Sequence, residues 1–217
     1  MWEVVNLIPT KGEWNKALCE RHGEKLLKKF SVATVAICGL GGLGSNIAIS
    51  LARAGIGKLI LIDFDRVDIT NLHRQQYKVN QIGMNKTNAL FENLREIAPY
   101  IDLEIHTARV TEENAAHLLR DADIICEAFD DAEAKAMLTN LVLETMPDKY
   151  LVAASGMAGF GSANTIRTRK VMKRFYLCGD EESDVQSEGS LVSSRVMLCA
   201  AHQAHAVLRI LVGEFET

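Results

Sequence analysis

The stretch that decides the fold is Val32-Ala33-Thr34-Val35-Ala36-Ile37-Cys38, which runs directly into Gly39-Leu40-Gly41-Gly42-Leu43-Gly44. Seven nearly continuous apolar residues are typical of a strand that is buried on both faces of a parallel sheet. In the glycine loop, Gly39 permits a tight turn, Gly41 allows an anion to approach the backbone, and Gly44 lets a helix pack closely. Because such a loop presents backbone N–H groups at a helix N-terminus, it favours a bound phosphate.

Strands and helices alternate along most of the chain. Residues 45–54 have helical character and residues 58–63 predict a second strand, so that one βαβ unit of about 30 residues opens the domain. Further strands are predicted at residues 103–106, 123–129 and 150–154, and further helices at residues 85–97, 111–119 and 131–146. This alternation predicts a Rossmann-like α/β fold with a doubly wound, mostly parallel sheet.

The pattern differs at the two ends. Residues 1–31 mix charged and large apolar side chains, and they predict a loop and a helix packed outside a nucleotide-binding domain formed by residues 32–217. Near the C-terminus, residues 162–169 and 171–178 predict an antiparallel extension of the sheet. The acidic segment 180–189 predicts a mobile loop. Residues 191–212 predict a long helix buried against the sheet or a second subunit.

Composition sets broad bounds on function. The 24 basic and 28 acidic residues give a net charge of −4, which argues against a nucleic-acid platform. No apolar run approaches the roughly 20 residues that cross a bilayer, so we expect no membrane partner. The five cysteines are odd in number and scattered, and the first 16 residues lack a signal pattern. Reduced core thiols in a cytoplasmic protein are therefore expected.

Polar residues follow the strands where ligands bind in such folds. Asp63 ends the second predicted strand about 20 residues after the glycine loop, the position from which a Rossmann-type site binds ribose. Asn71, Arg74 and Gln75 add two amides and a cation a short way downstream. Asp130 follows the fourth predicted strand, and a carboxylate that faces phosphates there predicts a Mg²⁺ ligand. Its neighbour, Asp131, is a predicted helix N-cap.

The usual meaning of a glycine loop followed by a strand-end acid is a dinucleotide dehydrogenase. A non-catalytic NAD- or nucleotide-binding module is a further alternative. Two features point elsewhere: the chain leaves little room for a separate substrate domain, and residues 64–76 are dense in polar groups that could reach phosphates. A bound NAD would not need these groups. The pattern therefore favours a nucleotide whose phosphates are cut.

The ordered set of motifs resembles a known family. The stretches are Gly39-Leu40-Gly41-Gly42-Leu43-Gly44, Asp63-Phe64-Asp65, Asn71-Leu72-His73-Arg74-Gln75, Gly83-Met84-Asn85-Lys86 and Asp130-Asp131. Together they resemble the ThiF/MoeB group of adenylating enzymes, relatives of the ubiquitin-activating enzymes, over most of the chain from residue 32. Cys178-Gly179-Asp180 and Cys199-Ala200-Ala201-His202-Gln203 are similar to the short ThiF proteins of thiamine biosynthesis.

The resemblance implies an ATP-dependent adenylyltransferase. Its substrate would be the C-terminal glycine carboxylate of a small ubiquitin-like sulfur carrier protein, ThiS-like, with a MoaD-like carrier or a modified tRNA as alternatives. In this interpretation Arg74 and Lys86 neutralise phosphates, Asp63 fixes the ribose, and Asp130 binds Mg²⁺. The full set implied to bind ATP is Gly39, Gly41, Gly42, Gly44, Asp63, Asp65, Asn71, Arg74, Gln75 and Lys86.

Three further expectations follow from the resemblance. An arginine from the N-terminal helix of a partner subunit reaches the phosphates in this family, which implies a homodimer, and Arg21 is the candidate here. Many members hold zinc with two Cys-x-x-Cys pairs, both missing from this sequence, so we predict no zinc. Some members transfer sulfur through a cysteine. Cys178 is the candidate by position, with a buried structural thiol as the alternative and the sulfur donor unknown.

Overall fold

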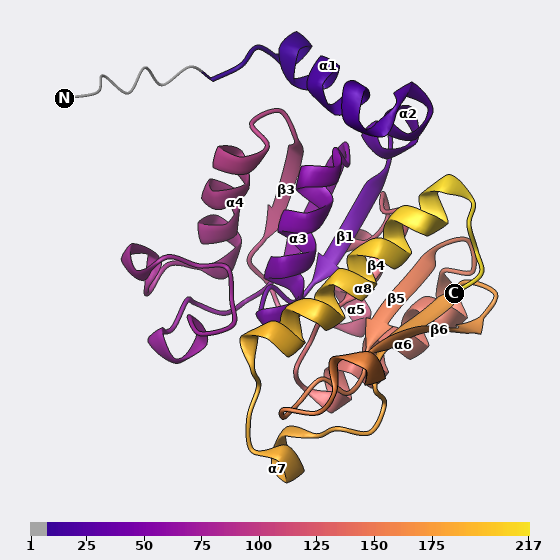
Figure 1. Ribbon diagram of the computed structural model, residues 1–217. Coiled ribbons are helices and arrows are strands. Elements are labelled where there is room, and N and C mark those ends of the chain that lie inside the picture. The colour runs from indigo at the N-terminus through magenta and orange to yellow at the C-terminus, as the bar shows by residue number, and fades with distance from the viewer. Residues whose placement is uncertain (1–7) are drawn as a thin grey trace.

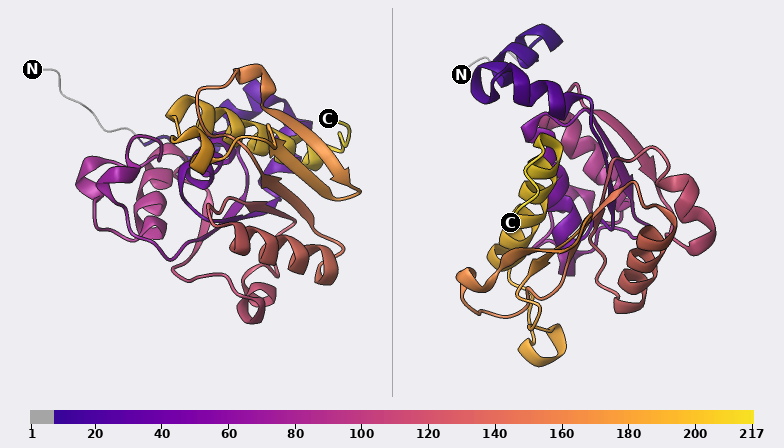
Figure 2. Two further views of the ribbon diagram at one scale, coloured as in Figure 1. Left: turned by 90° about the horizontal axis from the view of Figure 1, so that it is seen from below. Right: turned by 90° about the vertical axis from the view of Figure 1, so that its right-hand side faces the viewer.

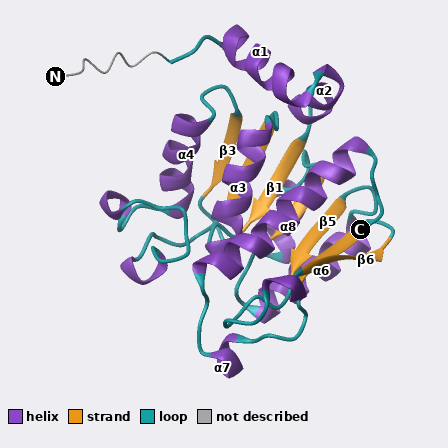
Figure 3. Ribbon diagram, viewed as in Figure 1, coloured by secondary structure: helices purple, strands orange, loops and turns teal. Residues whose placement is uncertain are grey.

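The computed structural model describes residues 8–217 and confirms the predicted α/β fold (Figure 1). The first seven residues lie outside the described part. The strands, orange in Figure 3, are β1 (Thr34–Cys38), β2 (Lys58–Ile62), β3 (Asp102–His106), β4 (Ile124–Glu127), β5 (Tyr150–Ala154), β6 (Arg167–Met172) and β7 (Phe175–Gly179). The helices are α1 (Lys11–His22), α2 (Glu24–Ser31), α3 (Gly42–Ala54), α4 (Lys86–Ile97), α5 (Glu112–Leu118), α6 (Ala132–Thr145), α7 (Val185–Glu188) and α8 (Ser193–Val212).

The strands form one sheet in the order β3-β2-β1-β4-β5-β7-β6. Neighbouring strands are parallel except for β6 and β7, which are antiparallel. The chain moves outward from β1 to β2 and β3, and then returns to place β4 on the other side of β1. Ligands bind at such a reversal, outside the carboxyl ends of the strands. The glycine loop lies at this point.

Helices cover both faces of the sheet, as the two views of Figure 2 show. Helices α3, α4 and α8 pack on one face, where Val35 and Ile37 of β1 are buried. Helices α5 and α6 pack on the other face, where Ala36 and Cys38 of the same strand are buried. Alternate residues of β1 therefore supply two cores, which explains why the strand is apolar throughout.

The turn from β1 into α3 depends on a contact between two glycines. Gly39 has a φ of +91°, which side chains other than that of glycine rarely adopt. A Cβ on Gly39 would also lie 2.7 Å from the carbonyl oxygen of Ala128, and a Cβ on Gly44 would overlap the carbonyl oxygen of Gly39. Helix α3 can therefore begin inside the loop at Gly42, rather than at Ser45 as the sequence suggests.

The N-terminal segment differs from the expectation of a loop and one helix, because it forms two helices, α1 and α2, on either side of Gly23. Both lie at the amino ends of the strands, at the opposite end of the molecule from α7 (Figure 1). Lys29 of α2 donates a hydrogen bond to the carbonyl oxygen of Val212 at 2.6 Å, which fastens α2 to the end of α8.

The antiparallel extension is confirmed, but its turn lies later than predicted. The connection between β6 and β7 is at Lys173 and Arg174, and residues 163–165 form a 3₁₀ turn instead of the start of a strand. The pairing is irregular between Lys170 and Met172. An extra residue of this kind leaves no mark in a two-residue polarity pattern, so the sequence could not locate it.

The acidic segment 180–189, expected to be a mobile loop, has defined hydrogen-bonded structure. It contains α7, whose N-cap Asp184 accepts a hydrogen bond from the N–H of Gln186 at 2.7 Å. Asp180 is buried against Arg195 of α8. The sequence pointed to a mobile loop because a run of acidic residues gives no sign of a buried cation on a later helix.

Helix α8 confirms the long buried helix. Val196, Cys199 and Val207 are buried, and the helix packs against α3 and against β5, β6 and β7. Even so, none of the helices in the described chain combines the length and apolar character needed to cross a membrane.

The contact between Gly39 and Gly44 predicts the effect of a single methyl group. Gly44→Ala should lower the free energy of unfolding by about 3 kcal/mol, because the new Cβ has no space against a backbone oxygen. Gly12→Ala in α1 is the matched control. No atom lies within 4 Å of its added Cβ, and alanine favours a helix by up to about 1 kcal/mol. Denaturation in urea measures both, and equal effects would contradict the packing argument.

Candidate nucleotide site

Asp63 anchors the glycine loop from the end of β2. Its Oδ2 accepts a hydrogen bond from the N–H of Leu40 at 2.6 Å, and its Oδ1 accepts one from the N–H of Asp65 at 2.7 Å. Burial raises the pKa of Asp63, while Lys86 and these two N–H groups partly offset the rise. Each carboxylate oxygen keeps a second lone pair, so the side chain can still accept hydrogen bonds from ribose hydroxyls.

Lys86 is a buried cation, only 5% exposed, at the start of α4. Its Nζ forms an ion pair with Oδ2 of Asp65 at 2.8 Å, and its N–H donates to the carbonyl oxygen of Asp65 at 2.9 Å. Lysine is rarely buried without a partner. The ammonium group therefore lies beside two carboxylates, those of Asp65 and Asp63, next to the glycine loop.

The side chains of Arg74 and Gln75 lie beside the glycine loop. A Cβ on Gly42 would be 3.5 Å from Cδ of Arg74, and a Cβ on Gly41 would be 3.8 Å from Nε2 of Gln75. Within residues 8–217, Arg74 has no carboxylate partner. Gln75 is buried, and its Oε1 has no hydrogen-bond partner in the described chain. A buried amide oxygen without a partner is uncommon, and a water molecule or a hydroxyl group of a ligand would satisfy it.

Asn71 supports this arrangement through its backbone. Its carbonyl oxygen accepts hydrogen bonds from the N–H groups of Arg74 at 3.2 Å and Gln75 at 3.1 Å. Its side-chain amide makes only a long contact with Oγ1 of Thr70 at 3.5 Å. The turn that begins at Asn71 thus sets the position of the cation and the amide, and a direct contact of Asn71 with a nucleotide stays a prediction.

Asp130 lies at the same edge of the sheet, just beyond β4. It is exposed and, in the described part of the chain, forms no ion pair. The end of β4 packs against the loop, because a Cβ on Gly39 would be 3.0 Å from Cδ1 of Phe129. Asp131 accepts a hydrogen bond from the N–H of Ala134 at 2.8 Å, which confirms it as the N-cap of α6.

A buried ion pair fixes the backbone before Asp130, and the sequence analysis missed it. The carboxylate of Glu127 is bound by Nζ of Lys135, with both oxygens at 3.0 Å, and it also accepts from the N–H of Phe129 at 2.7 Å. Lys135 also donates to the carbonyl oxygen of Ala154 at the end of β5. Burial raises the pKa of Glu127, and Lys135 opposes the rise. The only available signal was an acid inside an apolar strand.

The residues present fit Mg²⁺ that is held mainly by phosphates. Across residues 8–217, no group of three or more His, Cys, Asp or Glu side chains could hold a metal unaided. Mg²⁺ in nucleotide sites needs only one or two carboxylates, because phosphates and water fill its other positions. Asp130 is one exposed carboxylate at the edge where phosphates are expected.

Two predicted residues lie away from this cluster. Arg21 is on α1, at the amino end of strands that are about 17 Å long, so it cannot reach the glycine loop of its own chain. Cys178 is fully buried in β7, and burial raises the pKa of its thiol to about 12. A reactive cysteine needs exposure and a lowered pKa. The geometry thus favours a structural thiol at Cys178 over sulfur transfer.

Asp180 and Arg195 form a second buried ion pair, and nothing in the sequence indicates that these two residues meet. Both side chains are less than a tenth exposed. Burial raises the pKa of Asp180, but hydrogen bonds from Ser183, Glu182 and Arg195 outweigh this effect and lower the pKa to about 2. The carboxylate is therefore ionised at every physiological pH.

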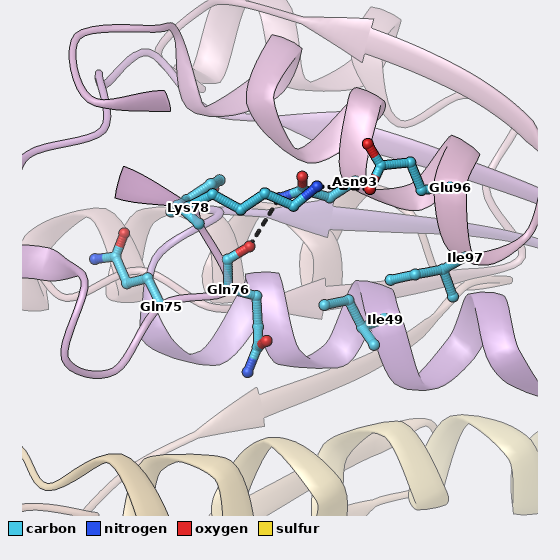
Figure 4. A pocket seen from close by; sticks show the side chains of 8 residues that line it. Ile49, Gln75, Gln76, Lys78, Asn93, Glu96 and Ile97 are labelled. Atoms are coloured by element: carbon cyan, nitrogen blue, oxygen red, sulfur yellow. Dashed lines mark hydrogen bonds and ion pairs between the residues drawn. The ribbon is translucent and has the colours of Figure 1, made fainter. Parts of the chain in front are cut away.

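A cavity of about 240 Å³ lies beside the site, between α3 and α4 (Figure 4). Ile49 and Ile97 line one end, and the side chain of Gln75 points away from them. The N–H group of the Asn93 amide donates to the carbonyl oxygen of Gln76 at 2.9 Å within the cavity wall. Because Gln75 lines this cavity and also lies beside Gly41, the cavity borders the cluster around the glycine loop.

Comparison with known proteins decides the family. A model of the ThiF family matches residues 15–217. The chain belongs to this family. A solved structure of E. coli tRNA N6-threonylcarbamoyladenosine dehydratase, TcdA, in complex with ATP has a TM-score of 0.83 to this ThiF-family chain. The two are 22% identical, and the match covers 94% of this chain and 97% of that one. This likeness shows the fold, and it confirms the Rossmann-like architecture.

Curated relatives are similar over parts of their length. "Adenylyltransferase and sulfurtransferase MOCS3" of Anopheles gambiae is 37% identical over 137 residues, which are 63% of this chain and 30% of the relative. "Adenylyltransferase and sulfurtransferase UBA4" of Lodderomyces elongisporus is 26% identical over 194 residues, 87% of this chain and 42% of the relative. The chain thus matches less than half the length of these two proteins.

The buried Lys86 allows a test of the site's charge balance. Lys86→Met should lower the free energy of unfolding by about 2 kcal/mol, because it leaves the carboxylates of Asp63 and Asp65 adjacent without a cation. Lys78→Met is the control, since its ion pair with Glu96 is exposed and such pairs contribute about 0.5 kcal/mol. Thermal and urea denaturation measure both. A loss no larger at Lys86 than at Lys78 would contradict the buried-cation interpretation.

The lowered pKa of Asp180 predicts a pH dependence. The ordinary value is 3.8 and the folded value is about 2, so the carboxylate stabilises the fold above pH 3.8 and loses this effect as the pH falls toward 2. Asp180→Asn should therefore cost about 2 kcal/mol at pH 5, and the difference from wild type should shrink below pH 3.8. Urea denaturation at a series of pH values measures it. A difference that stays constant from pH 5 to pH 2 would refute the assignment.

Proposed function

We propose that this ThiF-family chain is an ATP-dependent adenylyltransferase that activates the C-terminal glycine carboxylate of a small ubiquitin-like carrier protein. The observation that carries the proposal is that Arg74 and the amide nitrogen of Gln75 lie against the glycine loop. Asp63 binds the same loop, and the buried Lys86 pairs with Asp65 beside it. A bound dinucleotide, whose phosphates are not cut, would not need these phosphate-facing groups. The names of the relatives, adenylyltransferase and sulfurtransferase, support the same chemistry.

In the proposed reaction the carboxylate attacks the α-phosphorus of ATP. A carboxylate oxygen bonds to the phosphorus, the bond to the bridging oxygen of the β-phosphate breaks, and pyrophosphate leaves with the electron pair. Asp63 would orient the ribose, while the loop N–H groups, Arg74, Lys86 and Gln75 hold the phosphates. These groups act by position and charge, which is what phosphoryl transfer requires. Mg²⁺ held by Asp130 would neutralise charge on the leaving group.

The finer assignment is a ThiS-like carrier and a role in thiamine biosynthesis, in the cytoplasm. It is supported by the resemblance at residues 178–180 and 199–203. We further propose a homodimer in which Arg21 of α1 serves the site of the partner, because α1 lies too far from its own glycine loop to act within one chain. The donor of sulfur would act after adenylation and from outside this chain.

A modified tRNA is the second candidate, since the TcdA structure bears the name of a tRNA dehydratase. The net charge of −4 counts against it, because binding of nucleic acid is driven by cationic residues. An exchange assay separates the candidates, because only the true acceptor should stimulate the exchange of pyrophosphate into ATP.

The test of the proposal is ATP–pyrophosphate exchange with purified ThiS-like and MoaD-like carriers and with tRNA. We expect exchange with a carrier and none with tRNA. Asp130→Asn should slow this exchange about 100-fold, because it removes a charge that acts on the phosphates. Asp131→Asn is the matched control, since asparagine caps a helix as well as aspartate does. Equal rates for the two variants would remove Asp130 from the site, and exchange without any carrier would reject the proposed acceptor.

A further inference from the structure

Arg195, at the start of α8, is only 6% exposed. Because water cannot reach its guanidinium group, every donor nitrogen of that group is hydrogen-bonded to an acceptor of the protein. Four of its five acceptors belong to the segment that follows β5, and the fifth is Asp180, which follows β7. They are Ala158 O at 3.1 Å, Gly161 O at 2.7 Å, Ser162 O at 2.7 Å, Thr165 Oγ1 at 3.1 Å and Asp180 Oδ2. A guanidinium satisfied in this way leaves no donor for a ligand.

Asp180 fixes the second segment in turn. Its Oδ1 accepts from the N–H of Glu182 at 3.0 Å and from the N–H and hydroxyl of Ser183 at 2.9 Å. The two segments also touch, because a Cβ on Gly156, whose φ is +77°, would overlap Oδ1 of Asp180. Arg195 and Asp180 therefore lock residues 155–165 to residues 180–192, and we call this arrangement the Arg195 lock.

The locked segments lie on one side of the site. β5 and β7 are parallel to β1, so both segments leave the sheet at the carboxyl edge that carries the glycine loop. Asp63 ends β2, which lies on the other side of β1. A nucleotide whose ribose is at Asp63 and whose phosphates lie over the loop toward Asp130 leaves the ends of β5 and β7 free. An acceptor that approached the α-phosphate from this free side would pass the locked segments.

The locked segments are also joined to the phosphate-binding residues. His73 has its Nε2 3.2 Å from the carbonyl oxygen of Leu191, so the far end of the second segment is bound next to Arg74. In α8, Val196 packs against the glycine loop, since a Cβ on Gly42 would be 2.9 Å from Cγ1 of Val196. These contacts do not involve the side chains of Arg195 or Asp180, and they can persist when the lock is broken.

Glycine residues let the first segment pack closely against its neighbours. A Cβ on Gly156 would overlap Asp180, a Cβ on Gly159 would overlap Glu188, and a Cβ on Gly161 would be 3.2 Å from Nη2 of Arg195. The turn at Phe160 is 82% exposed and borders a cavity of about 150 Å³ between this segment and the first turns of α8. An exposed aromatic ring beside this cavity offers apolar surface that a bound tail would cover.

We propose that Arg195, together with Asp180, is a positioning residue that holds residues 155–165 and 180–192 as the wall along which the acceptor's C-terminal tail reaches the α-phosphate. This inference rests on the proposed function, because it assumes a carrier with a flexible, glycine-ended tail. Arg195 acts through the backbone that it binds and does not touch the reacting atoms.

The experiment measures pyrophosphate exchange as a function of carrier and of ATP concentration in the full chain. Asp180→Asn should raise the KM for the carrier about tenfold and change the KM for ATP less than twofold. Arg195→Lys should act in the same direction, because one ammonium group cannot reach five acceptors, and it keeps the buried carboxylate paired if Asp180→Asn folds poorly. Melting temperatures confirm that each variant is folded at the assay temperature.

Glu181→Gln is the matched control. Glu181 is the next residue along, and its ion pair with Arg169 is on the surface, so both KM values should stay within twofold of wild type. Equal rises in both KM values, or no rise in the KM for the carrier, would overturn the positioning role. Absence of carrier-dependent exchange in the wild type would instead reject the proposed function, and the two failures are thereby distinguished.

Discussion

The site depends on a single backbone contact, the approach of Gly44 to the carbonyl oxygen of Gly39. This contact lets α3 begin within the loop, so that the helix N-terminus opens directly at the end of β1. Asp63 can then bind the N–H of Leu40, and the end of β4 can pack against Gly39. A strand end, a helix end and a neighbouring strand are thus brought together by the absence of two side chains. The anion-binding character of the loop is a consequence of how the sheet and the helix pack.

The alternating strands and helices and the glycine loop could be predicted from the sequence. Apolar runs located the parallel strands, and the glycine loop indicated the candidate nucleotide site, because both are local patterns with a direct steric cause. The pairing of Arg195 with Asp180 and of Lys135 with Glu127 could not be predicted. Each pair joins residues on different elements, and a charged residue carries no local sign of its partner. The burial of Cys178, in contrast, was one of the two alternatives that its place at the end of a predicted strand allowed.

Two buried ion pairs stiffen the carboxyl edge of the sheet beyond the glycine loop. Lys135 joins the end of β4 to that of β5, and Arg195 joins the segment after β5 to the one after β7. Compared with apolar residues of similar size, buried pairs of this kind add little stability, because the loss of hydration offsets the attraction between the charges, whereas removing one partner leaves the other charge buried and is costly. Their effect is geometric, since each fixes a backbone that would otherwise be a loop. Rigidity at this edge matters for a reaction that depends on in-line alignment of its reactants.

The charge balance of the site has a consequence for assembly. Lys86 is already paired with Asp65, and Asp63 adds another negative charge next to it. Arg74 is therefore the one cation at the glycine loop, within the described residues, whose charge no carboxylate offsets. A triphosphate brings several negative charges, and more charge moves onto the leaving group during its departure. One free guanidinium cannot neutralise them. In the proposed reaction, Mg²⁺ and Arg21 of a partner subunit would supply the remaining positive charge, because α1 lies beyond the far end of its own sheet.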